Sequence, residues 1–170
     1  WARVPAPPVL SDPSMDSIKV SVGTGDLNPP STEYALRLRT EGKEVQWIQA
    51  GGIAGDAPEW KTADAWATVI VSGLAPATGY HVSCVARNGA GEMTEAGPEE
   101  VIHTQCDLKY TAGENGTVTE ALRLAAYGSD GPPITATPAP GYRFAGWSDG
   151  ATENPRQDRN ITANIAVEAL

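Results

Sequence analysis

The strand that decides the fold of the first half lies in the stretch SGLAPATGYHVSCVARN, residues 72–88. From position 80 onward apolar and polar residues alternate, which predicts a β-strand with one buried and one solvated face. The expected buried face carries Tyr80, Val82, Cys84 and Ala86, and the expected wet face carries His81, Ser83, Val85 and Arg87. Ahead of the strand, we expect Leu74 to plug the core and Pro76 to fix a turn. The ring of Tyr80 is expected to be buried there, with its hydroxyl bonded to the backbone upstream.

Shorter runs of the same kind surround this stretch. Alternating or β-branched segments occur at residues 18–22, 34–39, 45–50, 68–71 and 100–104. About seven strands in roughly 100 residues is the rhythm of a Greek-key sandwich. The 18 Gly and 14 Pro among 170 residues indicate many turns and argue against a mainly helical protein.

Residues 72–88 resemble the E–F corner and F strand of a fibronectin type III domain, and the resemblance extends over about residues 4–104. It implies an immunoglobulin-like sandwich of two antiparallel sheets. One departure lies in the second strand, where Val20 or Val22 replaces a core tryptophan that is common in the family. We expect that volume to be filled by one of three other tryptophans, Trp47, Trp60 or Trp66. Residues 51–67 are long and irregular, so the sequence does not establish their register.

The second half carries a different pattern, centred on PGYRFAGWSDG at residues 140–150. A strand, a glycine turn and a second strand are expected over residues 110–118, and further strands over 134–138 and 161–169. The other characteristic residues of this half are Tyr110, Gly113, Asn115-Gly116, Asn154-Pro155-Arg156 and the run NITANI at 160–165.

Together these residues resemble the divergent internalin B-repeat family of bacterial surface proteins, over about residues 107–170. The resemblance implies a small, mostly β unit of the β-grasp type, in which Trp147 packs with Tyr142 and Phe144. Residues 104–107 lie between two strand-like runs, and we place the domain boundary there. We therefore expect an all-β chain: an immunoglobulin-like Greek-key sandwich at 1–104, followed by a small β-grasp-like repeat domain at 105–170.

One segment of the second half is ambiguous. Residues 119–126, TEALRLAA, have strong helix propensity. Leu122, Leu124 and Ala126 also alternate, however, and the family pattern places a strand here. Because a β-rich context commonly overrides short-range propensity, we favour a strand over a helix for residues 119–127.

Charge and hydropathy exclude two classes of function. The net charge is −9, from 12 Lys and Arg against 21 Asp and Glu, and no basic cluster is present. Nucleic-acid binding is not expected, because phosphate neutralisation needs clustered cations. Direct membrane insertion is not expected either, since no apolar run approaches the roughly 18 residues that span a bilayer.

No residue set points to catalysis. His81 and His103 are interpreted as surface histidines, and no nucleophile elbow is present. Residues 148–150, Ser-Asp-Gly, lack the ligand spacing of a calcium loop and are interpreted as a turn. Cys84 is expected to be a buried small hydrophobe, and Cys106 an unpaired or reducible thiol in the linker, with a bridge between the two as the minor alternative. We therefore expect no enzyme, no catalytic residue, no cofactor and no metal site.

Two tryptophans are candidates for contact with a ligand. Trp60 and Trp66 flank the irregular loop, and exposed tryptophan faces are used by sugar-binding modules. Packing is the alternative for both. The function we expect is that of a non-catalytic extracellular module pair of a bacterial cell-surface or secreted protein, monomeric and acting as a spacer or display segment. The alternatives are an adhesion module that binds a carbohydrate or a host protein at the cell surface, and an accessory region of a secreted polysaccharide-degrading enzyme.

Overall fold

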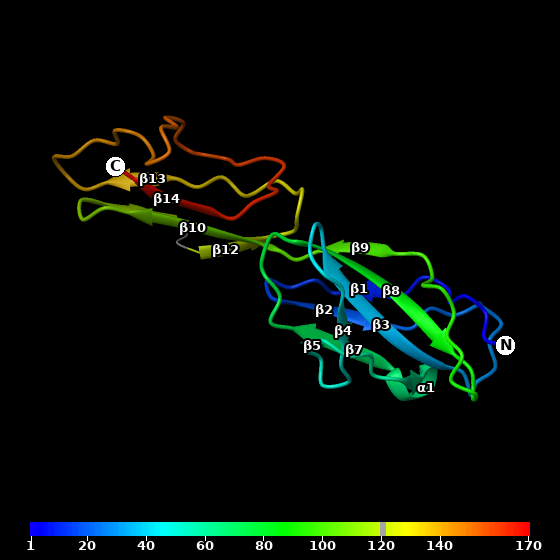
Figure 1. Ribbon diagram of the computed structural model, residues 1–170. Helices are drawn as coiled ribbons and strands as arrows, with labels where there is room; N and C mark the ends of the chain where they lie inside the picture. The colour runs from blue at the N-terminus through cyan, green and yellow to red at the C-terminus, as the bar shows by residue number, and fades with distance from the viewer. Residues whose placement is uncertain (120–121) are drawn as a thin grey trace. The chain divides into compact units, whose positions relative to one another are not determined.

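The computed structural model of the protein describes residues 1–119 and 122–170. They form two compact units, Trp1–Thr104 and Gln105–Leu170, which we call the first and the second unit (Figure 1). Among the described residues, no helix has the length and apolarity needed to cross a bilayer. The prediction of an all-β protein with an immunoglobulin-like sandwich is confirmed.

The first unit consists of two antiparallel sheets. The three-stranded sheet has the order β1-β2-β7, formed by Val9–Ser11, Ser17–Ser21 and Thr68–Ser72. The larger sheet has the order β5-β4-β3-β8-β9, and β6 also pairs with β3. Its strands are β3 (Glu33–Thr40), β4 (Gln46–Ile48), β5 (Ala54–Gly55), β6 (Lys61–Thr62), β8 (Gly79–Arg87) and β9 (Glu100–His103).

Alternate residues of the facing strands form the core between the two sheets. Ile18 and Val20 of β2 and Leu36 and Val82 of the larger sheet are completely buried. Trp66 belongs to the same cluster, so it is the tryptophan that compensates for the valines of the second strand. It reaches the core from a four-residue helix that the sequence did not predict, α1 (Ala63–Trp66), whose N-terminus is capped by the side chain of Thr62.

The corner before β8 has the predicted construction. Leu74 is partly buried and packs against the core cluster. Tyr80 is 7% exposed, and its hydroxyl oxygen accepts the backbone N–H of Ala75 at 2.8 Å. The tyrosine thus joins the core to the loop that enters β8, and it holds this corner in one conformation.

We predict that Tyr80→Phe lowers the free energy of unfolding of the first unit by about 1 kcal/mol, the usual net value of one hydrogen bond. Urea denaturation read through amide resonances of the first unit measures this loss. Tyr142→Phe removes the hydroxyl of a tyrosine in the second unit that is 59% exposed, and it should leave the stability of the first unit unchanged. An unchanged stability of the first unit in Tyr80→Phe would contradict a stabilising role for this corner.

The outer side of β8 differs from the prediction. Ser83 and Val85 were expected to be solvated, but they are 2% and 8% exposed. Ala35, which lies opposite Val85 on β3, is also completely buried. Strand alternation places these side chains on the outer side of the sandwich, so their burial depends on cross-strand packing rather than on the pattern of the strand itself.

The second unit is built around one central strand. β10 (Cys106–Ala112) pairs antiparallel with β12 (Leu122–Ala125) and parallel with β14 (Ile165–Ala169). The strands β11 (Gly116–Val118) and β13 (Ala136–Pro138) pair antiparallel and form a separate two-stranded ribbon.

Three expectations for this unit are decided by these strands. The strand prediction for residues 119–127 is confirmed for residues 122–125, but residues 119, 126 and 127 lie outside the strand. Residues 120–121 lie outside the described part of the chain. The last strand is shorter than expected, because Ile161 forms an isolated bridge with Ser129 and the chain turns before β14 begins. The placement of Cys106 in a linker is wrong: it begins β10, and its side chain is completely buried.

Candidate functional site

Trp66 cannot serve as an exposed ligand contact. It is 4% exposed, and its indole N–H donates to the backbone oxygen of Tyr34 at 2.8 Å. Trp60 is half-buried, and the guanidinium carbon of Arg87 lies 4.6 Å from its ring centroid. The two rings therefore form no exposed aromatic pair, and only Trp60 stays available at the surface.

Charged side chains on the larger sheet form two paired groups. Arg87 Nε donates to Glu33 Oε2 at 2.6 Å, across the β3–β8 pair. Arg39 Nε donates to Glu99 Oε1 at 2.9 Å, and these hydrogen bonds from Arg39 lower the pKa of Glu99 below its ordinary value. His81, interpreted from the sequence as an ordinary surface residue, has its Nδ1 3.3 Å from the same carboxylate.

The two cysteines are free and completely buried, each in its own unit. Burial raises the pKa of the Cys84 thiol to about 12 and also raises the pKa of Cys106. The Cys106 thiol faces the backbone oxygen of Ile161 at 3.7 Å. Because the reactive species is the thiolate, both side chains act as small hydrophobes at neutral pH.

Trp147 is the centre of the second unit. It is 1% exposed, and its indole N–H donates to the backbone oxygen of Glu153 at 2.9 Å. Phe144 and Tyr110 meet it edge to face, with ring centroids 5.7 and 6.3 Å away. The expected packing of Trp147 with Phe144 is confirmed, but Tyr142 is 59% exposed, so its expected place in this cluster is wrong and Tyr110 takes it.

A buried ion network lies against this ring. Arg156 is 8% exposed and forks onto Asp158, with Nε and Nη2 at 2.8 and 2.7 Å from its two carboxylate oxygens. Its Nη1 donates to Asp149 at 2.7 Å, and its guanidinium carbon lies 5.7 Å from the Trp147 centroid. The hydroxyl of Tyr110 donates to Asp158 at 2.7 Å. The network joins β10 to two loops that are distant in sequence.

This network also decides the role of the 148–150 turn. Asp149 is bound by Arg156, and its Oδ1 accepts the backbone N–H of Ala151 at 3.2 Å. The N–H of Gly150 donates to the oxygen of Trp147, which closes the turn. Within residues 1–119 and 122–170, no group of three His, Cys, Asp or Glu side chains is placed to hold a metal ion.

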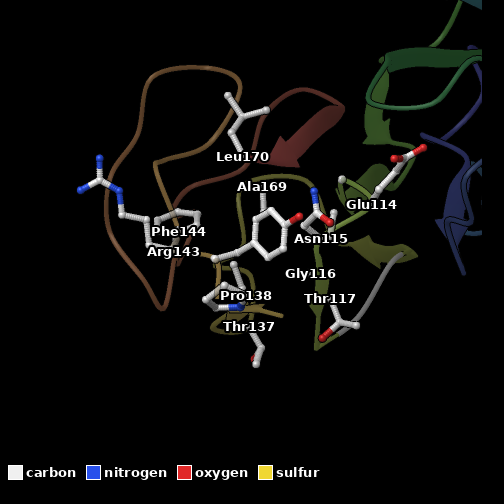
Figure 2. A pocket seen from close by; sticks show the side chains of 14 residues that line it. Glu114, Asn115, Gly116, Thr117, Thr137, Pro138, Arg143, Phe144, Ala169 and Leu170 are labelled. Atoms are coloured by element: carbon white, nitrogen blue, oxygen red, sulfur yellow. The ribbon is translucent and has the colours of Figure 1, made fainter. Parts of the chain in front are cut away.

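A shallow groove of about 190 Å³ lies elsewhere in the second unit (Figure 2). Its walls are the turn at 113–117, the β13 residues Thr137 and Pro138, and the loop that carries Arg143 and Phe144. Arg143 and Glu114 lie at opposite ends of it (Figure 2). The lining between them is mostly small or apolar, so the groove brings no set of charged groups together.

Residues 106–170 match the family model of the divergent InlB B-repeat domain. We therefore call the second unit the B-repeat unit. No curated protein matches the chain.

Among solved structures, the chain is similar to fibronectin type III domains. A human domain of this type is 15% identical, with a TM-score of 0.41, and the match covers 61% of this chain and 72% of that one. The domain of human fibronectin type III domain containing protein 3 is 18% identical, with a TM-score of 0.42, over 59% and 84%. A two-domain segment of chicken tenascin is 14% identical, with a TM-score of 0.43, over 96% and 85%. The assignment of the first unit as a sandwich rests on its own strand order and buried core.

We predict that the B-repeat unit loses stability in acid through the Arg156 network. Hydrogen bonds from Arg156 lower the pKa of Asp158 and of Asp149 below the ordinary 3.8. A carboxyl whose folded-state pKa is depressed contributes stability that is fully present above its unfolded pKa and is lost as the pH falls through the folded value. Urea midpoints of the B-repeat unit should therefore fall as the pH drops below about 4.

The same titration in Arg156→Met tests the assignment. Without the guanidinium, the two carboxyl groups have little reason to titrate below their ordinary range, so the acid-dependent loss should shrink. An unchanged slope in the variant would assign the acid sensitivity to other groups.

Sequence reasoning missed the partners of Arg156. The motif Asn154-Pro155-Arg156 was visible, but the two aspartates and Tyr110 come from positions that only the fold brings together. It also missed two hydrogen bonds between the Asn154 side chain and the backbone of β13. The side chain accepts from the N–H of Ala136 at 3.0 Å and donates to the backbone oxygen of Ala136 at 2.8 Å. An Asn that precedes a Pro in a loop gives no such signal in a single sequence.

Proposed function

We propose that this chain is a non-catalytic spacer or display segment of a bacterial cell-surface or secreted protein. The match of residues 106–170 to the B-repeat model supports the surface-type assignment. Both domain types are typically non-catalytic modules. The observation that carries the spacer role is the connection between the two units.

The connection is one residue long. Thr104, the last residue of the first unit, is completely buried; its hydroxyl donates to the oxygen of Ala75 at 2.7 Å and accepts the N–H of Thr78 at 3.0 Å. Cys106 is already paired with Ala125 and completely buried in the B-repeat unit. Only Gln105 lies between these two anchored positions.

A one-residue connection has few torsions to vary, unlike a flexible tether of Gly and Ser, whose ends spread with the square root of its length. Each unit also has its own buried core, so neither depends on the other for its hydrophobic packing. Both properties suit a segment that keeps another domain at a set distance from a surface.

The width of the distance distribution between the two units tests this proposal. Nitroxides at Lys43→Cys and Ala166→Cys, both exposed positions in different units, report it by pulsed electron paramagnetic resonance. The buried native thiols, with their raised pKa values, leave the two introduced cysteines as the reactive ones. We expect one narrow distribution for this chain.

The control inserts about eight Gly and Ser residues after Gln105, which converts the connection to a flexible coil. The distribution should then broaden and shift. A native distribution as broad as that of the insertion variant would overturn the spacer role. Equal melting of the two proteins by circular dichroism would show that the insertion leaves both units folded.

A further inference from the structure

The outer face of the larger sheet carries an ordered set of side chains. Along β3, residues Tyr34, Leu36 and Leu38 belong to the core, so the alternate residues face outward. We define the outer face by these β3 residues and the cross-strand partners that the register places beside them: Glu33, Ala35, Arg37 and Arg39 on β3, Arg87, Val85, Ser83 and His81 on β8, and Trp47 on β4.

Two half-buried tryptophans lie at one edge of this face. Trp47 is opposite Arg37 across the β3–β4 pair. Trp60 directly precedes Lys61, which pairs with Tyr34, so Trp60 reaches the level of Ala35 on the same edge of β3. Its stacking with Arg87 places its ring on the outer face, where Arg87 also meets Glu33.

The charges of this face leave one cation without an acidic partner. Arg87 is paired with Glu33, and Arg39 is paired with Glu99. Arg37, between them on β3, makes no hydrogen bond or ion pair with any described residue. When Glu99, which lies beside the face and pairs with Arg39, is counted with Glu33, three arginines stand against two glutamates. These five residues carry a net charge of +1 on a protein whose net charge is −9.

An unpaired guanidinium is the natural partner of a carboxylate, because its planar fork donates two parallel hydrogen bonds to it. Arg37 is the register partner of Trp47 on the same face, and the Trp47 indole is only half-buried. A ligand complementary to both groups has a carboxylate next to a ring with an apolar C–H face. Sugars that carry a carboxylate, the uronic acids, have this chemistry, whereas an aspartate or glutamate side chain has the carboxylate without the ring.

We propose that the outer face of the first unit binds a uronic acid residue of an anionic polysaccharide, with Arg37 holding the carboxylate and Trp47 packing against the sugar ring. Trp60 borders the same face, and its ring is held in place by Arg87. The pairs Arg87–Glu33 and Arg39–Glu99 neutralise the glutamates that would otherwise repel the ligand. Because the face has one free cation, it should bind one uronate residue at a time. A polymer that presents many uronates should therefore raise the apparent affinity.

Calorimetric titration of the full chain with trigalacturonate tests the proposal. The matched ligand is the methyl ester of the same trisaccharide, which keeps the rings and removes the charge. We expect weak, saturable binding of the acid with a Kd on the order of 1 mM or tighter, and no measurable binding of the ester. Absence of binding by the acid, or equal binding of both, would overturn the proposal.

The variants separate a site from general electrostatics. Arg37→Gln and Trp47→Ala should each weaken binding on the order of tenfold, since one loses the charged fork and the other the stacking surface. Arg159→Gln makes the same charge change on the B-repeat unit, where the Arg159 side chain is 71% exposed, and should leave binding unchanged. Equal weakening by Arg159→Gln would identify a nonspecific charge effect and overturn the site.

A peptide of three glutamates supplies carboxylates without sugar rings. Binding of this peptide as tight as that of trigalacturonate would overturn the sugar class. Circular dichroism melting of each variant shows whether it is folded, and Arg37→Lys gives a second variant that keeps the charge but loses the bidentate fork. The distance measurement between the two units does not involve Arg37, so a failure of this site and a failure of the spacer role are distinguishable.

Discussion

Trp147→Ala is expected to unfold the B-repeat unit while the first unit stays folded. Trp147 is 1% exposed and holds Phe144 and Tyr110 around it, so its truncation leaves a large cavity at the centre of the unit. Replacing a buried tryptophan with alanine costs about 3–5 kcal/mol. A domain of about 60 residues buries only about 60% of the surface that its unfolded chain exposes, less than a larger domain does, and is therefore only marginally stable. Such a loss therefore approaches the whole free energy of unfolding of this unit.

Two-dimensional amide NMR of the full chain measures this outcome, because resonances of the two units can be followed separately. Those of the B-repeat unit should collapse to the narrow range of an unfolded chain, while those of the first unit stay dispersed. Tyr142→Ala is the control: it removes an aromatic side chain of the same motif that is 59% exposed, and it should cost well under about 1 kcal/mol. Dispersed B-repeat resonances in Trp147→Ala would contradict the central role of this ring.

Arg156→Met is expected to destabilise the B-repeat unit by about 3 kcal/mol, since removal of one partner leaves buried charge uncompensated. The variant keeps a long side chain but leaves Asp158, whose side chain is 18% exposed, without its bidentate partner. Asp149 is more exposed, at 39%, and water can replace part of what it loses. The measurement is the urea midpoint of the B-repeat unit at neutral pH.

Two further variants show whether the loss comes from the network. Arg159→Met removes an arginine whose ion pair with Asp130 is at the surface, and it should cost between about 0 and 1 kcal/mol. Adding Asp158→Asn to Arg156→Met removes the unpaired carboxylate and should restore part of the lost stability. A double variant less stable than Arg156→Met, or equal losses from Arg156→Met and Arg159→Met, would contradict the assignment.

Local patterns were sufficient for most strands. The alternation over residues 80–87 and the tyrosine at its start correctly predicted β8 and the corner before it, because period-two burial and a buried tyrosine with a bonded hydroxyl are properties of a few consecutive residues. The strand at 122–125 was also predicted correctly against its helix propensity, since pairing with β10 outweighs the preference of a short segment.

Errors arose where burial depends on residues far away in sequence. Ser83 and Val85 lie on the outer side of β8 yet are buried by neighbours on other strands. Tyr142 and Trp147 belong to one motif, but only the fold decides that Trp147 is central and Tyr142 is exposed. The two candidate tryptophans differ in burial for the same reason. A short helix after an irregular loop places Trp66 in the core, whereas Trp60 stays half-buried.

The sequence by itself determined that this protein is nearly all β and that its two halves carry different patterns. Strand alternation, turn residues and the motif around Trp147 are local signals, since each depends only on residues that are adjacent in the sequence. The tertiary structure alone decided the Arg156 network, the depth of each tryptophan and the position of Arg37 beside Trp47. Each of these depends on which strands pair and in which register. Register is decided by the packing of a whole face, and a shift of one residue would turn every side chain to the other side of the sheet.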